Sequence, residues 1–411
     1  MRVGILAYHT ACNYGANLQV LSTVGYLHRN GHQAFVINYE ADDFVEYYKR
    51  KVSKETYDFY KTFREELMPL TRHCSTMKEI ARIIEDSQIE AVIIGSDAVA
   101  QHHSFLERIT FPSSRGITIH KVTSDRLFPN PFWGTFSFYL SKKIPMALMS
   151  ASSQDSDYRL FLPSVRKRMY NCLHQFEYIS VRDEWTQRMY QAISNNRIYA
   201  DLTPDPVFSF NQNQKGLIPA KMDLLKKFDL PENYFLLSFL NDNTVSTKWL
   251  ETFEQAAKER GISCVALPFP QGLKFSNNLE YKIPSPLSPV DWYALIKYSK
   301  GYIGHNMHPI VVSLHNVVPF YSFDNYGVSR YRGLYTNDSS SKIYDLLRKA
   351  ALSDNRISCI KYAYNPPKAS DVLEKLLNFD LKKESLFADS YQNNYEVMMA
   401  NIIHKFETFY R

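Results

Sequence analysis

The stretch that decides the fold is GYIGHNMHPIVVSLHNVVPFYSF, from Gly301 to Phe323. Short apolar runs within residues 300–305 and 318–323 are of the kind found in buried strands. Residues 307–315 between them predict a helix that is also buried. A strand, a helix and a second strand in this order are typical of two parallel strands joined by a crossover helix, which is the repeating unit of α/β folds.

The same alternation of strands and helices occurs in both halves of the chain. In the first half, strands are expected at residues 2–8, 34–39, 90–97, 144–150, 178–183 and 196–201. In the second half, they are expected at residues 234–240, 263–269, 300–305 and 318–323. Apolar strands separated by helices predict a parallel sheet that is buried on both faces. Ligands bind such sheets outside the carboxyl ends of the strands, so two α/β domains that face each other predict a site in the cleft between them.

A polar, proline-containing stretch at residues 209–232 resembles a linker between the two halves. We therefore expect an N-terminal α/β domain over residues 1–212 and a C-terminal α/β domain over residues 213–365. Residues 366–411 are expected to form a helical tail.

Composition and cysteine spacing exclude several classes of protein. The five cysteines are far apart and include no Cys-x-x-Cys pair, which argues against a disulfide framework or a cysteine-based zinc site and fits a reducing cytoplasm. The N-terminus reads as a strand rather than a signal peptide, and no apolar run approaches the roughly 20 residues of a spanning helix. We therefore expect a cytoplasmic protein.

The charge and the aromatic residues bear on the partners of the chain. The net charge of +6 includes no dense block of lysine and arginine, so nucleic acid is not expected as a partner. The aromatic content of 14% indicates flat contact surfaces, either for sugars or within the core. The aromatic stretch 128–140 and the positive charge would allow contact with the inner, anionic face of a membrane. Packing of this stretch inside the protein is the favoured interpretation.

The segment YHTACNYGANLQ, from Tyr8 to Gln19, lies where a strand ends and a helix begins. Backbone N–H groups at the start of a helix are unpaired and attract anions. Gly15 would let the backbone approach a ligand closely, and Asn13 either turns the chain or contacts that ligand. The alternative is an ordinary turn between a strand and a helix. The segment is not a dinucleotide-binding motif, because it lacks Gly-x-Gly-x-x-Gly.

Three further polar motifs follow predicted strands of the first half. In IIGSDAV, Asp97 either caps the next helix or accepts the proton of a sugar hydroxyl. In SVRDEWT, Arg182 either grips a carboxylate or phosphate with two hydrogen bonds or pairs with Asp183. In DPVF, Asp205 before a proline reads as a rigid turn near the cleft.

The histidines of the opening stretch divide into two groups. His305 and His308 lie at the junction of strand and helix, where a ligand is expected, and the imidazole of His308 is able to exchange protons near neutrality. His315, seven residues after His308, is interpreted as a core or surface histidine. No metal site is predicted, because the carboxylate spacing of His-Glu-x-x-His is missing.

Taken together, the motifs resemble the polysaccharide pyruvyltransferase family. They occur in the family's order over roughly residues 1–350, and each is weakly specific by itself. The matching segments are Asn13–Gln19, Gly95–Asp97, Ser180–Thr186, Asp205–Phe208, Gly304–Pro319 and Ser341–Ile343.

The resemblance implies two Rossmann-like domains facing a cleft, similar to the GT-B glycosyltransferase arrangement. It implies transfer of pyruvate from phosphoenolpyruvate onto a sugar as a cyclic ketal, in the synthesis of capsule or exopolysaccharide. The acceptor would be galactose or a related hexose of a lipid-linked oligosaccharide. Phosphoenolpyruvate would be a co-substrate, and no cofactor would be needed.

Site roles follow from the resemblance together with the residue chemistry. His308 is expected to act as the acid, and Asp97 or His9 as the base. The donor is expected to contact a second group of residues, namely Asn13, Gly15, Arg182, His305, Asn306, Arg330 and Lys342.

One departure from the family concerns Asn306, which stands where many members carry an arginine. Another cation must then hold the donor's negative charge, and the candidates are Arg182, Arg330, Arg332 and Lys342. Two rival functions stay open: a sugar-nucleotide glycosyltransferase on the same architecture, and a non-catalytic carbohydrate-binding assembly protein.

Overall fold

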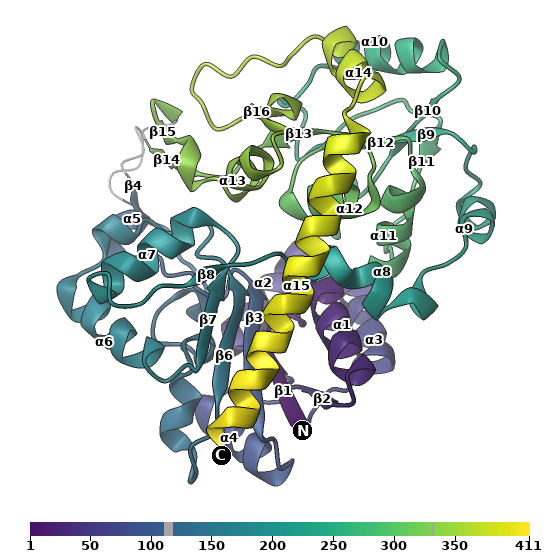
Figure 1. The fold of residues 1–411 in the computed structure, drawn as a ribbon. Coiled ribbons are helices and arrows are strands. Elements are labelled where there is room, and N and C mark those ends of the chain that lie inside the picture. Colours follow the sequence, from purple (N-terminus) through teal and green to yellow (C-terminus); the bar gives the residue numbers. More distant parts are fainter. Residues whose placement is uncertain (111–117, 331–332) are drawn as a thin grey trace.

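The computed structural model describes residues 1–110, 118–330 and 333–411 and contains two six-stranded parallel sheets (Figure 1). The first sheet has the order β2-β1-β3-β6-β7-β8. Its strands are β1 (Arg2–Leu6), β2 (Gln33–Val36), β3 (Ala91–Asp97), β6 (Met146–Ala151), β7 (Tyr178–Val181) and β8 (Asp201–Leu202). The predicted strand over residues 196–201 is therefore wrong in extent, since only Asp201 and Leu202 pair with β7.

The second sheet has the order β11-β10-β9-β12-β13-β16, which is the Rossmann order. Its strands are β9 (Tyr234–Ser238), β10 (Ser263–Ala266), β11 (Tyr281–Lys282), β12 (Gly301–Gly304), β13 (Phe320–Asp324) and β16 (Arg356–Ser358). Two short antiparallel pairs lie outside the sheets, β4 (Ile109–Thr110) with β5 (Thr118–Ile119) and β14 (Val328–Arg330) with β15 (Tyr335–Asn337). The prediction of two parallel α/β sheets is confirmed.

Helices cover both faces of each sheet because alternate strand residues bury apolar side chains on opposite sides. In β3, Ala91 and Ile93 belong to one core, whereas Val92 and Ile94 belong to the other. The helices of the first half are α1 (Tyr14–Arg29), α2 (Asp42–Lys51), α3 (Lys54–Leu67), α4 (Met77–Asp86), α5 (Phe105–Arg108), α6 (Pro163–Leu173) and α7 (Glu184–Ser194). Those of the second half are α10 (Thr247–Lys258), α11 (Pro289–Tyr298), α12 (Met307–Asn316), α13 (Lys342–Lys349) and α14 (Ala369–Leu377).

The stretch at residues 209–232, expected to be a linker, is partly helical. It contains the helices α8 (Phe210–Asn213) and α9 (Lys221–Phe228). Leu224 of α9 is buried in the core that the two sheets share, so the segment gains apolar burial that its polar composition conceals.

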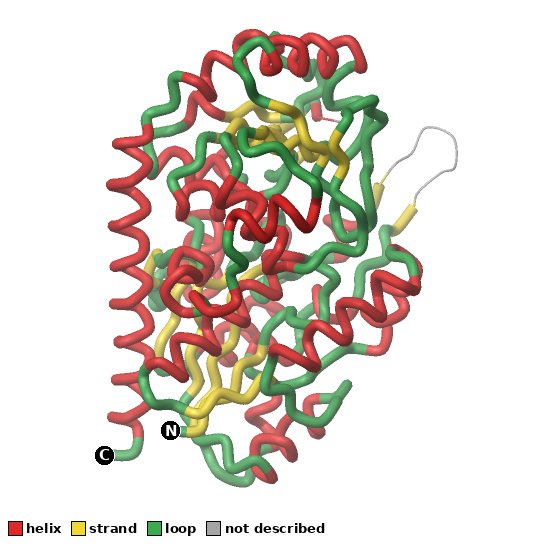
Figure 2. The backbone as a smooth tube through the Cα atoms, turned by 90° about the vertical axis from the view of Figure 1, so that its right-hand side faces the viewer, coloured by secondary structure: helices red, strands yellow, loops and turns green. Residues whose placement is uncertain are grey.

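The chain ends in a single long helix, α15 (Leu381–Phe409), which runs past both sheets (Figures 1 and 2). Near its start, Tyr391 packs on Phe208, with ring centroids 5.1 Å apart. Further along, Tyr395 meets Tyr26 of α1 edge to face, at 5.8 Å. The C-terminus thus lies near β1, on the same side of the molecule as the N-terminus (Figure 1). The predicted helical tail joins the two halves.

The aromatic stretch 128–140 lies partly inside the first domain and partly on its surface. Trp133 and Phe136 are buried in the core beneath the first sheet, as the favoured interpretation predicts. Phe138 and Tyr139 are exposed. No helix of the described residues is both long enough and apolar enough to cross a membrane.

Candidate functional site

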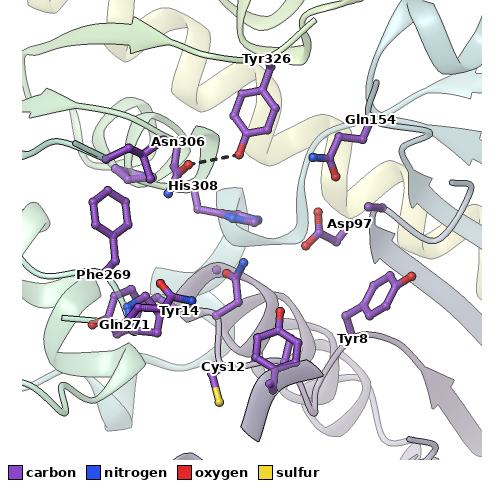
Figure 3. Close-up of a pocket in the computed structure, with 18 of the residues that line it drawn as sticks. Tyr8, Cys12, Tyr14, Asp97, Gln154, Phe269, Gln271, Asn306, His308 and Tyr326 are labelled. Carbon is purple, nitrogen blue, oxygen red and sulfur yellow. Dashed lines mark hydrogen bonds between the residues drawn. The ribbon is translucent and has the colours of Figure 1, made fainter. Parts of the chain in front are cut away.

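A pocket lies between the carboxyl ends of the two sheets, and the loops that follow their strands form its walls (Figure 3). The first sheet contributes lining residues after β1, β3 and β6, and the second contributes them after β9, β10, β12 and β13. These loops include the points where the strand order reverses, between β1 and β3 and between β9 and β12. Parallel sheets bind their ligands at such points.

His308 and Gly15 bring the two halves into contact inside this pocket. Gly15 is the second residue of α1, and His308 is the second residue of α12. A Cβ atom added to Gly15 would lie only 1.9 Å from Cγ of His308, so the imidazole occupies the space that a side chain would need. Gly15 therefore leaves room for His308, and the close approach of a ligand to its backbone stays a prediction.

Asn13 caps the start of α1, which faces the pocket. Its side-chain oxygen accepts a hydrogen bond from the N–H group of Ala16 at 3.2 Å, which caps the helix. Asn13, Tyr14 and Gly15 all line the pocket. The first turn of the helix therefore presents its positive end to this space.

A buried charge network lies behind the pocket wall. The guanidinium of Arg182 donates to Asp97 at 2.7 Å and to Asp205 at 2.8 Å. Asp205 also accepts a hydrogen bond from Gln19 at 2.6 Å, and its carboxylate lies 3.8 Å from Nε2 of His308. Arg182 is not among the lining residues, so it orders the two carboxylates rather than facing the pocket.

The network shifts the pKa values of the groups that face the pocket. Burial would raise the pKa of Asp97, but the charge of Arg182 outweighs burial and holds this pKa below its ordinary value. Burial lowers the pKa of His308, although the carboxylates of Asp97 and Asp205 oppose that shift. Nε2 of His308 is buried and has no hydrogen-bond partner among the described residues. An ionised Asp97 and a partner-free imidazole therefore share one pocket.

Lys342, the first residue of α13, is a cation that lines the same pocket. Its ammonium lies 4.3 Å from the ring centre of Tyr326, and within the described residues it forms no ion pair or hydrogen bond. Burial and the charge of Arg182 lower the pKa of Lys342 to about 8. Tyr326 also donates a hydrogen bond to Asn306 at 3.3 Å, and all three residues line the pocket. Lys342 and Asn306 thus both contact Tyr326.

Besides Arg182, three predicted site residues lie outside the pocket lining. His9 is fully buried, and its two ring nitrogens are hydrogen-bonded to the backbone oxygen of Ala7 and to Asn38, so the placement does not support a role as base. Nδ1 of His305 accepts a hydrogen bond from the N–H group of Leu240.

Arg330 forms an ion pair with Asp157 between the two halves, and this placement does not support contact with a donor in the pocket. Arg332 lies outside the described residues. His315 is buried beside Phe208 and Tyr293, as expected of a core histidine.

Several residues that line the pocket are not among those predicted from the sequence. Gln101 follows β3, Gln154 follows β6, and Tyr326 follows β13. The signal that finds Asp97, a polar residue just after an apolar strand, applies to Gln154 as well. Arg126, from the 3-10 turn Ser124–Arg126, carries no signal of this kind, since it arrives from a loop between elements.

The two-domain fold is shared with solved structures of low sequence identity. A UDP-GlcNAc 2-epimerase from Methanocaldococcus jannaschii is 12% identical, with a TM-score of 0.54, and the alignment covers 98% of this chain and 99% of that one. A UDP-GlcNAc 2-epimerase from Neisseria meningitidis, solved bound to UDP-GlcNAc, is also 12% identical, with a TM-score of 0.54 and coverage of 98% and 100%. The GT-B-like arrangement is thereby confirmed.

Comparison with curated proteins gives no match. The model of the family described as polysaccharide pyruvyl transferase matches residues 13–326, which is well over half of the chain. This range includes the start of α1, the Asp97 and Arg182 motifs, and the His308 segment. The protein is a transferase enzyme and belongs to the polysaccharide pyruvyl transferase family.

Proposed function

We propose that this protein transfers the pyruvyl group of phosphoenolpyruvate to two hydroxyls of a sugar, forming a cyclic ketal. One observation carries the proposal. In a pocket of a pyruvyl transferase family member, the partner-free imidazole of His308 shares the space with ionised Asp97, the ammonium of Lys342 and the positive end of α1. This arrangement combines an anion site with an acid and a base.

The donor's negative charge would be held by α1 and Lys342. Phosphoenolpyruvate carries a carboxylate and a phosphate, so it needs N–H groups and cations around it. The first turn of α1 supplies the N–H groups, and Lys342 supplies a charge that has no carboxylate partner in the described structure. Lys342 thereby takes over the task of the arginine that many family members carry at the position of Asn306.

Proton transfer would begin at His308. Its imidazolium gives a proton to the methylene carbon of the donor, which becomes a methyl group and leaves the central carbon electrophilic. Burial keeps free His308 mainly uncharged, but the negative charge of a bound donor favours the imidazolium form. Donor binding would therefore favour protonation of His308, which is the proposed acid.

Two bonds then form at the central carbon and one bond breaks. The first sugar hydroxyl attacks this carbon and gives its proton to Asp97. A carboxylate with a lowered pKa suffices as acceptor, because a hydroxyl bonded to an electrophilic carbon is strongly acidic. The carbon–oxygen bond to phosphate breaks, and phosphate leaves with the electron pair and takes up the proton from Asp97. The second hydroxyl closes the ketal and returns a proton to His308.

The acceptor is proposed to be galactose or a related hexose on a lipid-linked oligosaccharide, within capsule or exopolysaccharide synthesis. Family membership supports an acceptor that belongs to polysaccharide synthesis. Such an acceptor would bring the enzyme to the inner face of a membrane, to which the net charge of +6 is suited.

The decisive experiment incubates the protein with phosphoenolpyruvate and a lipid-linked galactoside and measures phosphate release together with the acceptor's mass. Sugar-dependent phosphate release and a pyruvate ketal on the acceptor are expected. Release of nucleotide from a sugar nucleotide without phosphoenolpyruvate would instead indicate a glycosyltransferase. Acceptor binding without turnover of either donor would indicate a non-catalytic assembly protein.

A further inference from the structure

Two glutamine side chains form a hydrogen-bonded pair in the pocket wall beside Asp97. Nε2 of Gln101 donates to Oε1 of Gln154 at 3.2 Å, and both residues line the pocket. They follow β3 and β6, which are neighbours in the first sheet and place Asp97 opposite Ala151. Figure 3 shows the side chain of Gln154 on the same side of the pocket as Asp97, with His308 pointing toward both.

Backbone hydrogen bonds fix the two loops that carry this pair. The N–H group of Ser152 donates to the oxygen of Asp97 at 2.8 Å, and the N–H group of Ala100 donates to the oxygen of Ser152 at 3.2 Å. The N–H group of Gln154 donates to the hydroxyl of Ser152 at 3.1 Å. Gln101 itself is only 3% exposed. The amide pair is therefore a rigid feature of the wall and not a pair of mobile surface side chains.

Backbone strain is stored on both sides of this wall. Gln154 has φ of 54° and Asp97 has φ of 70°, in the left-handed region that residues with a Cβ atom seldom adopt. Strain of this kind concentrates at binding and catalytic sites. In the structure it directs both side chains toward the same part of the pocket.

The pair leaves one hydrogen-bond acceptor and one donor group free. Within the described chain, neither Oε1 of Gln101 nor Nε2 of Gln154 has a partner. A sugar hydroxyl both donates and accepts, so one hydroxyl fits the free carbonyl oxygen and its neighbour fits the free NH₂ group. We propose that Gln101 and Gln154 bind the two acceptor hydroxyls that become the ketal oxygens, and present the first to Asp97 and the second to His308. This assignment rests on the proposed function.

The experiment compares Gln154→Met and Gln101→Met, which keep side-chain length and neutrality but remove the amide. Gln33→Met, at an exposed glutamine far from the pocket, is the matched control. Dissociation constants are measured by titration for methyl galactoside, methyl glucoside and phosphoenolpyruvate, with melting temperatures as the check on folding. Each pocket variant should weaken glycoside binding about tenfold, as expected for one or two lost hydrogen bonds, and leave the affinity for phosphoenolpyruvate within about twofold.

The double variant should lose less than the product of the two single losses, because the amides act as one unit. Unchanged glycoside affinity in Gln154→Met would overturn the assignment, as would a parallel loss of affinity for phosphoenolpyruvate or a wild-type protein that binds neither glycoside. If a glycoside binds through the pair but no phosphate is released from phosphoenolpyruvate with any acceptor, the proposed function fails and the hydroxyl site stands.

Discussion

At the scale of single residues, His308 is the side chain at which the two domains and the charge network meet. It contacts Gly15 from the first domain and lies 3.8 Å from the carboxylate of Asp205. Its Nε2 is buried and has no hydrogen-bond partner among the described residues.

Replacing His308 by alanine should therefore lower kcat by roughly 10²–10⁴, the usual contribution of a positioned acid or base. Binding of the sugar should change far less, since the proposed hydroxyl site at Gln101 and Gln154 lies on another wall of the pocket. Steady-state kinetics with a separate binding titration would separate the two effects. Near-normal turnover in the variant would remove His308 from this role.

As a proposed donor-binding residue, Lys342 would set a pH limit on donor binding. Its pKa of about 8 means that the ammonium is charged below pH 8 and loses its proton above it. Affinity for phosphoenolpyruvate should thus fall as pH rises through about 8, a range in which the donor's phosphate is already fully ionised.

Titrations between pH 6.5 and 9.5 would reveal this break. Lys342→Arg should retain binding at high pH, because a guanidinium stays protonated. Lys342→Met should bind weakly at every pH. The assignment would be contradicted if the affinity of the wild type for phosphoenolpyruvate did not change with pH. It would also be contradicted if Lys342→Met showed the same pH dependence as the wild type.

At the scale of elements, the start of α1 and the start of α12 are in contact across the cleft. Alanine normally stabilises a helix relative to glycine by about 1 kcal/mol. At Gly15 the opposite is expected, because the added methyl would overlap the ring of His308 and overpacking costs about 1–3 kcal/mol.

A double-mutant cycle measured by urea unfolding tests this contact. Gly15→Ala should destabilise the wild-type protein but be neutral or stabilising in a His308→Ala background, where the ring is gone. An equal effect of Gly15→Ala in both backgrounds would show that His308 does not occupy this space in solution.

The elements differ in how well their sequences predict them. Buried parallel strands such as β3 and β12 are predictable because they consist mainly of apolar or small residues. The segment 196–201 is misjudged, since edge strands bury little and carry a weaker pattern; only Asp201 and Leu202 join the sheet. Helix α9 is missed because only Leu224 and Leu225 of its eight residues are buried.

At the scale of the whole molecule, α15 ties the two domains together along one side (Figure 2). Its first turn buries Glu384, which is inaccessible to solvent and has no hydrogen-bond partner for either carboxylate oxygen among the described residues. Burial raises the pKa of Glu384 to about 9, so the side chain is protonated at neutral pH in the folded protein.

This carboxyl makes stability depend on pH. The folded state holds its proton above the ordinary value of 4.5, where the unfolded state has lost it, so stability should fall as pH rises from about 4.5 to about 9. At pH 7 the difference amounts to roughly 3 kcal/mol.

Glu384→Gln removes the titration while keeping the shape of the side chain. Its free energy of unfolding should exceed that of the wild type at pH 8 and approach it at pH 5. Urea unfolding at both pH values measures this difference. Parallel pH dependence in the two proteins would show that Glu384 is not buried as a neutral acid.

The sequence by itself determined the two α/β halves, the family motifs, and the positions of Asp97 and His308 after strands. These features are local, because an apolar run and the residue at its end can be recognised from a short window of sequence. Only the tertiary structure shows that His308 packs on Gly15 and that Lys342 faces the pocket. It also shows that Arg182 forms ion pairs with two carboxylates. These contacts join residues that are far apart in the sequence. Their hydrogen-bond partners and their burial are therefore set only when the folded chain brings those segments together.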